Sequence, residues 1–98
     1  MVTFDDFKTS LAQDAPPAGL SVPLQALWWA GKDDWNRAHT LVMGDEGADA
    51  AWVHAYLHRV EGDLPNARYW YRQAQREPAT TELDVEWGAI ARAMLAAP

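Results

Sequence analysis

The sequence predicts an all-α fold, with two tandem antiparallel helical hairpins and a flanking helix at each end. Apolar residues recur every three or four positions, and no segment alternates with period two for long enough to form a strand. In addition, "GKDDWNRAHTLV" and "EGDLPNARYWYR" both run from a turn with glycine and acids into an alanine-centred helix. The 98 residues make one domain, 1–98, with one modest core.

The N-terminal helix is predicted over 1–13. Thr3 can cap it, and Asp6 stands three residues later, where a capping box places its second partner. A loop over 14–23 follows, because paired prolines and a glycine in "DAPPAGLSVP" exclude regular structure.

The first hairpin is predicted over 24–44. Asp33 or Asp34 can cap its second helix, and Gly44 can end that helix. Trp28 and Trp29 are adjacent, and neighbouring helical side chains point about 100° apart. One of the two rings is therefore expected to meet a neighbouring molecule.

The second hairpin is predicted over 48–77. Gly62 marks its turn, Asp63 can cap its second helix, and Pro65 fits the first turn of that helix. A C-terminal helix is predicted over 81–96, with Thr81 as its cap and one apolar stripe, formed by Leu83, Trp87, Ile90 and Met94. The four acids of 77–86 are interpreted as the solvated start of this helix.

The segment "AYLHRVEGDLPNARYWYRQAQREP" resembles a tetratricopeptide or SEL1-like repeat. Gly62 lies at the turn between helices, and the second helix of the repeat pattern is matched by Ala67, Trp70, Tyr71 and Ala74. The resemblance implies a superhelix of helical hairpins whose concave groove holds a partner. The whole chain is also similar to a group of short bacterial proteins, and that likeness implies no activity.

Composition excludes several classes of function. The chain has no cysteine, which excludes disulfides and thiolate metal sites. Its net charge of -6 disfavours attraction to nucleic acid or to an anionic membrane. No apolar stretch approaches the length of a membrane span, and the N-terminus carries acids where a secretory signal carries bases. A cytoplasmic protein is expected.

Two surfaces are candidates for binding a partner. The SEL1-like resemblance implies that Trp52, Tyr56 and Arg59 face the concave groove, although both rings could instead pack on the final helix. The second candidate is a basic strip on the outer side of the following helix, formed by Arg68, Tyr69, Arg72 and Arg76. The alternative is an ordinary solvated helix face, with the tyrosine lying over arginine stems.

His54 and His58 are a candidate metal site. They stand four residues apart, so both rings can reach one divalent ion, and Glu61 follows one turn later. The zinc-protease pattern would need a glutamate after the first histidine, and Ala55 stands there. His39 could join only through tertiary contact. The alternative is a hydrogen-bonded histidine pair without metal.

Other catalytic signatures are missing: the sequence has no phosphate loop and no nucleophile elbow. We therefore expect a non-enzymatic module for protein–protein interaction or self-association, without a cofactor. Its partner would be a protein, a peptide or a second copy of the chain. A small metal- or ligand-binding protein, or an enzyme, that uses His54, His58 and Glu61 is the alternative.

Overall fold

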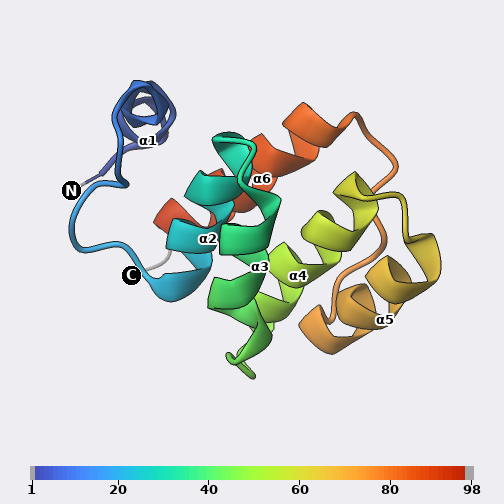
Figure 1. Ribbon diagram of the computed structural model, residues 1–98. Helices are drawn as coiled ribbons and strands as arrows, with labels where there is room; N and C mark the ends of the chain where they lie inside the picture. Colours follow the sequence, from blue (N-terminus) through green and yellow to red (C-terminus); the bar gives the residue numbers. More distant parts are fainter. Residues whose placement is uncertain (1, 97–98) are drawn as a thin grey trace.

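The computed structural model describes residues 2–96 and is built of helices and connecting segments, with no β-strand in that range (Figure 1). The predicted all-α fold class is therefore confirmed. In chain order the elements are α1 (Phe4–Thr9), a short 3-10 helix η1 (Ser10–Ala12), α2 (Val22–Gly31), α3 (Trp35–Met43), α4 (Ala48–Val60), α5 (Leu64–Ala74) and α6 (Leu83–Ala96).

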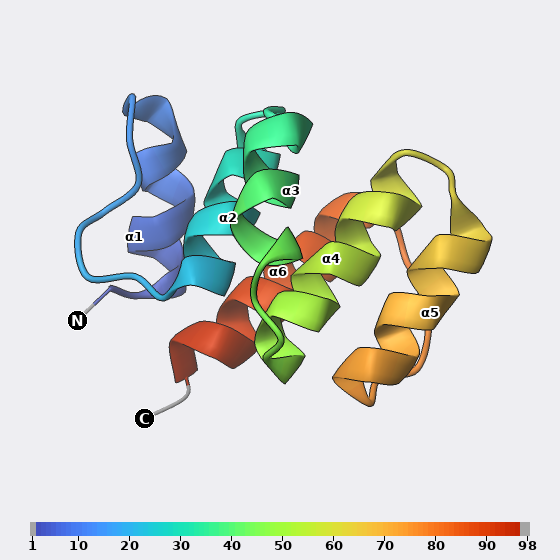
Figure 2. The ribbon, with the colours of Figure 1, turned by 60° about the horizontal axis from the view of Figure 1, so that its bottom comes forward.

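Helices α2 and α3 form one hairpin, and α4 and α5 form another. The two hairpins meet through α3 and α4, while α6 returns across α2 and α4 (Figures 1 and 2). Helix α1 lies at the far end of the molecule and packs on α6. None of the helices in residues 2–96 combines the length and the apolar composition needed to cross a membrane.

Local capping explains where most helices start. The Thr3 hydroxyl accepts from the Asp6 backbone N–H, and the Asp6 carboxylate accepts from the Thr3 N–H, so the predicted capping box is present. Of the two aspartates proposed for α3, Asp34 is the cap, and Asp63 caps α5 as expected.

The two hairpins have the same type of turn between their helices. In each, backbone N–H groups just after the first helix bond back to carbonyls of its last turn, as in a Schellman motif. The residue that must adopt the left-handed conformation is Gly62 in the second hairpin, with φ 84°, and Asp33 in the first, with φ 62°. The repeat seen in the sequence is thus also a repeat of backbone geometry.

Several helix boundaries differ from the predicted ones. Helix α2 begins at Val22, ahead of position 24, because Ser21 caps it and a proline fits its first turn. Helix α5 ends at Ala74, because Gln75 takes the left-handed conformation. Helix α6 begins at Leu83, so Glu82 stands directly before it and the predicted capping by Thr81 is wrong.

The surplus aromatic rings are largely accounted for within the molecule. Trp28 is fully buried, whereas its neighbour Trp29 is half-buried and is covered by an arginine. Rings on three helices are covered by an arginine in this way. The guanidinium lies 3.7 to 4.0 Å from the ring centroid in the pairs Arg37–Trp29, Arg76–Trp52 and Arg92–Phe4. Arginine side chains therefore shield these rings from water.

Candidate functional site

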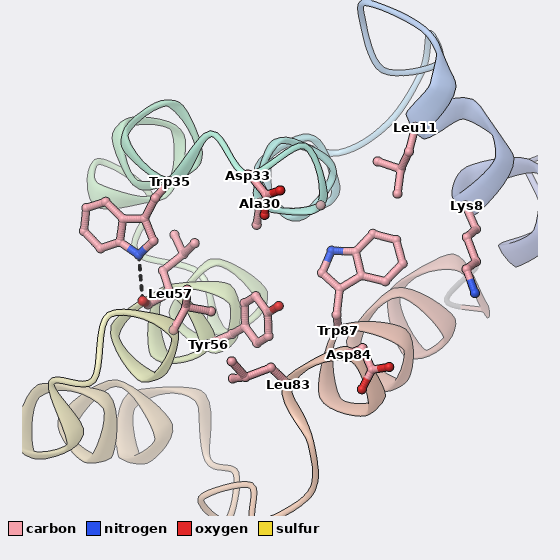
Figure 3. A pocket seen from close by; sticks show the side chains of 12 residues that line it. Lys8, Leu11, Ala30, Asp33, Trp35, Tyr56, Leu57, Leu83, Asp84 and Trp87 are labelled. Carbon is pink, nitrogen blue, oxygen red and sulfur yellow. Dashed lines mark hydrogen bonds between the residues drawn. The ribbon is translucent and has the colours of Figure 1, made fainter.

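A cleft of about 440 Å³ opens where α2, α4 and α6 meet, with α1 and η1 at one end (Figure 3). Its walls are mostly apolar, formed chiefly by Leu11, Trp35, Tyr56, Leu57, Val60, Leu83 and Trp87. A volume of this size accommodates one or two side chains of a bound molecule, and apolar walls with a few polar groups are typical of binding sites.

Hydrogen bonds fix the two tryptophan rings of the cleft. The indole Nε1 of Trp87 donates to the Leu27 carbonyl at 2.8 Å, and its ring stacks on Phe7 at 5.4 Å. The Nε1 of Trp35 donates to the Leu57 carbonyl at 2.7 Å (Figure 3). The cleft is therefore formed before any ligand arrives, because its walls are held by the core.

The rim of the cleft is both apolar and charged. Val60 and Leu83 are 42% and 38% exposed, and their side chains border the opening. Lys8 and Asp84 lie on the Trp87 side, and Asp33 lies at the end of α2 (Figure 3). A bound molecule would meet an apolar floor with charges of both signs around it.

Asp33 combines a position on the cleft with a costly backbone conformation. Its φ of 62° is disfavoured for a residue with a Cβ atom, and the equivalent position of the second hairpin is glycine. Left-handed residues other than glycine are often found where function keeps the side chain. The carboxylate of Asp33 is therefore a candidate functional group at the cleft.

We expect Asp33→Gly to raise the free energy of unfolding by about 0.5–1 kcal/mol, because glycine adopts this conformation without steric cost. The measurement is urea denaturation of the variant against the wild type. Asp33→Asn is the control: asparagine tolerates the left-handed region, so its stability should remain close to that of the wild type. A loss of stability in Asp33→Gly would show that the Asp33 side chain stabilises the turn.

The residues predicted to face a concave groove are mostly engaged inside the molecule. Trp52 and Tyr56 are 9% and 7% exposed, and Arg59 pairs with the buried Glu86 at 2.9 Å. Tyr56 alone of the three lines the cleft, opposite Trp87 (Figure 3). Burial raises the pKa of Tyr56 to about 12, with the Glu86 charge adding to the shift. The role of these three residues in binding a partner stays a prediction.

Of the predicted basic strip, Arg68, Tyr69 and Arg72 lie on the exposed face of α5, whereas Arg76 lies beyond the end of the helix, because Gln75 takes the left-handed conformation. Arg68, Tyr69, Arg72 and Arg76 are exposed, with Tyr69 at 46%. Arg76 stacks on Trp52, and Tyr69 meets Trp70 edge to face with the ring centroids 5.0 Å apart. The strip thus covers aromatic rings of α4 and α5, and its role in binding stays a prediction.

The candidate metal ligands form two neighbouring pairs in the structure. His58 and Glu61 interact directly, with Nδ1 and Oε1 2.6 Å apart. His54 meets His39 of α3, with their Nε2 atoms 3.0 Å apart. Burial lowers the pKa of His54 to about 4, and both neighbouring histidines add to the shift. His54 is therefore neutral at pH 7.

The interpretation of Glu86 as one of the solvated acids at the start of the final helix is wrong. Glu86 is 4% exposed and holds three elements together, because Arg59 of α4 and the Tyr71 hydroxyl of α5 both donate to its carboxylate. Burial and this hydrogen bond raise the pKa of Tyr71 well above its usual value. No residue pattern marks a carboxylate as buried when its partners lie in other helices.

Most of the cleft also went unrecognised in the sequence. Leu83 and Trp87 belong to the predicted apolar stripe of the final helix, but the stripe alone does not show that part of it faces an opening. Asp33 could have been found from the repeat, because it stands where the second hairpin has Gly62. Lys8 and Asp84 join the site only through tertiary packing.

Comparison with known proteins identifies no relative: no family model, no curated protein and no solved structure matches this chain. The resemblance of the second hairpin to tetratricopeptide or SEL1-like repeats therefore stays a prediction.

Proposed function

We propose that this chain is a non-enzymatic protein–protein interaction module, made of tetratricopeptide or SEL1-like hairpins, that receives an apolar side chain of a partner protein or peptide. The observation that carries the proposal is the cleft between α2, α4 and α6, with its apolar floor and its charged rim. An apolar anchor that fills a preformed pocket, surrounded by polar groups, is how many interfaces gain most of their affinity.

The fixed walls support binding without rearrangement. Trp87 and Trp35 are held by hydrogen bonds to backbone carbonyls, so little side-chain entropy is lost when a partner enters. Val60 and Leu83 already expose apolar surface at the opening. A partner side chain would bury this surface together with the floor.

Charge indicates what should flank the anchor. The rim carries two negative groups, Asp33 and Asp84, and one positive group, Lys8. The chain as a whole has a net charge of -6. Such a field favours encounter with a basic partner. We therefore expect a segment in which a large apolar residue is flanked by lysine or arginine.

The test is selection from a displayed random peptide library against the immobilised chain, followed by affinity measurement on the selected peptides. Peptides with a large apolar residue beside a basic one are expected to be enriched. Leu83→Lys should weaken their binding at least about tenfold, because it places a charge at the opening. Arg68→Ala, on the outer side of α5, is the matched control and should bind as the wild type does.

Other outcomes would contradict the proposal. Equal binding by Leu83→Lys and the wild type would place the peptide elsewhere, and a library without enriched peptides would argue against peptide binding by the cleft. A dimer that becomes a monomer in Leu83→Lys, measured by light scattering, would show that the cleft binds a second copy in place of another protein.

A further inference from the structure

The three histidines of the chain come together on the side of the molecule where the two hairpins meet. His39 belongs to α3, and His54 and His58 stand on successive turns of α4. One ring nitrogen from each histidine lies within 4.8 Å of the corresponding nitrogens of the other two. His54 and His58 are buried, and His39 is half-buried, so one edge of the cluster is accessible to solvent.

Two tryptophans hold the rings in place. Trp35 stacks on His39 with the ring centroids 4.7 Å apart, and Trp70 stacks on His54 at 3.9 Å. Both pairs are nearly parallel, with interplanar angles of 11°. Rings fixed in this way lose little freedom when they bind an ion, which favours a defined donor set.

The third ring is oriented by a carboxylate. The Nδ1 of His58 lies 2.6 Å from an oxygen of Glu61, so in the Nδ1–H tautomer the ring donates to this carboxylate and Nε2 keeps a free lone pair. Metal-binding histidines commonly donate their second nitrogen to a carboxylate in this way. Glu61 is thus suited to position His58, whereas the sequence indicated it as a direct ligand.

We propose that His39, His54 and His58 bind one divalent transition-metal ion, with zinc as the expected ion and Glu61 as a positioning residue. Imidazole nitrogen is a preferred donor for Zn²⁺, and three histidines leave one of its four positions free for an exogenous ligand. None of the three histidines lines the cleft, but the two sites adjoin, because Trp35 lines the cleft and also stacks on His39.

The distances fit such an ion after a small movement. Two nitrogens on a tetrahedral zinc lie about 3.3 Å apart, given Zn–N bonds of about 2.0–2.1 Å. The Nε2 atoms of His39 and His54 are 3.0 Å apart, the separation of a hydrogen bond that one of the two rings donates to the other. Zn²⁺ would take the place of this hydrogen bond: the ring that donates it would carry its proton on Nδ1 in place of Nε2, and the His58 ring would move inward to complete the set.

A second group of ligands lies nearby and must be distinguished. His58, Glu61 and Asp63 also come within 4.8 Å of one another, with both acids exposed. Asp63 is already used as the cap of α5, and Glu61 already pairs with His58. The three-histidine set is favoured because Trp35 and Trp70 pack on two of its rings and its donor nitrogens lie close together.

The test is calorimetric titration of ZnCl₂ into the full chain after treatment with a chelator. One Zn²⁺ per chain is expected, together with a higher melting temperature. His39→Gln should weaken binding at least about tenfold, since even loss of an outer hydrogen-bond partner costs about 10- to 100-fold. Glu61→Gln should weaken Zn²⁺ binding by about 10- to 100-fold.

Two controls accompany the titration. Asp63→Asn keeps a good helix cap and should bind Zn²⁺ as the wild type does. Leu83→Lys, which blocks the cleft, should also leave Zn²⁺ binding unchanged, so failure of the metal site and failure of the proposed cleft are distinguishable.

The histidine side-chain ¹⁵N spectrum of the wild type provides a readout that does not depend on folding of the variants. Zn²⁺ is expected to shift the ring nitrogens of all three histidines. Shifts confined to His58, or Zn²⁺ binding that survives His39→Gln but is lost in Asp63→Asn, would assign the ion to the exposed acidic group and overturn the proposal. Failure of the wild type to bind Zn²⁺ would also overturn it.

Discussion

Replacing Glu86 with alanine is expected to lower the free energy of unfolding by about 3–5 kcal/mol, because removing one partner of a buried ion pair leaves the other uncompensated. Glu86 accepts from Arg59 at 2.9 Å and from the Tyr71 hydroxyl, and it is 4% exposed. The variant would leave the Tyr71 hydroxyl without this acceptor and the Arg59 guanidinium with only the Thr81 carbonyl. Urea denaturation followed by circular dichroism measures the loss.

Glu86→Gln is the matched variant. It keeps the size of the side chain and an acceptor oxygen, so it should lose less than half as much stability as the alanine variant. If both substitutions changed the free energy of unfolding by less than about 1 kcal/mol, Glu86 would not stabilise the junction of these three helices.

Trp28→Ala is expected to cost about 3–5 kcal/mol, the range found when a large buried ring is removed. Trp28 is fully buried, and its Nε1 donates to the Ser10 hydroxyl at 2.9 Å. The hydroxyl in turn donates to the Phe7 carbonyl, so the ring ties α2 to the segment that follows α1. Thermal and urea unfolding of the variant test this expectation.

The adjacent Trp29 provides the control for this experiment. Its ring is half-buried and covered by Arg37 at 3.9 Å, so Trp29→Ala should cost only about 1–2 kcal/mol. Equal losses from the two substitutions would contradict the assignment of one ring to the core and the other to an arginine-covered surface.

The sequence predicted the features that depend on neighbouring residues. Thr3 with Asp6, Asp34 and Asp63 cap helices through bonds that span three residues. Residue type and spacing identified Thr3 and Asp63, and they narrowed the cap of α3 to Asp33 or Asp34. The shared hairpin turn was likewise visible as a repeated pattern. The all-α fold class follows from these local signals together with the apolar periodicity.

The features that the sequence did not show depend on contacts between helices that are distant in the chain. Which ring Arg37 or Arg76 covers depends on how the helices lie against one another. His39 meets His54 only because α3 packs on α4, and Glu86 is buried only because α6 returns across α4. The cleft arises in the same way, from the junction of α2, α4 and α6.

The cleft and the histidine cluster are two different sites that form when the hairpins pack together. Leu57 and Tyr56 of α4 line the cleft, whereas His54 and His58 of the same helix join the histidine cluster with His39 of α3. One helix therefore contributes to both candidate sites with different side chains.

The central claim is that the cleft holds a partner's apolar side chain, and the most direct measurement is ¹H–¹⁵N chemical-shift mapping of the labelled chain titrated with a selected peptide. Binding in the cleft predicts the largest shifts at the Trp87 indole N–H and at the backbone amides of Val60 and Leu83. Shifts concentrated on Arg68, Tyr69 and Arg72, with the Trp87 indole unchanged, would contradict the claim and assign binding to the outer side of α5.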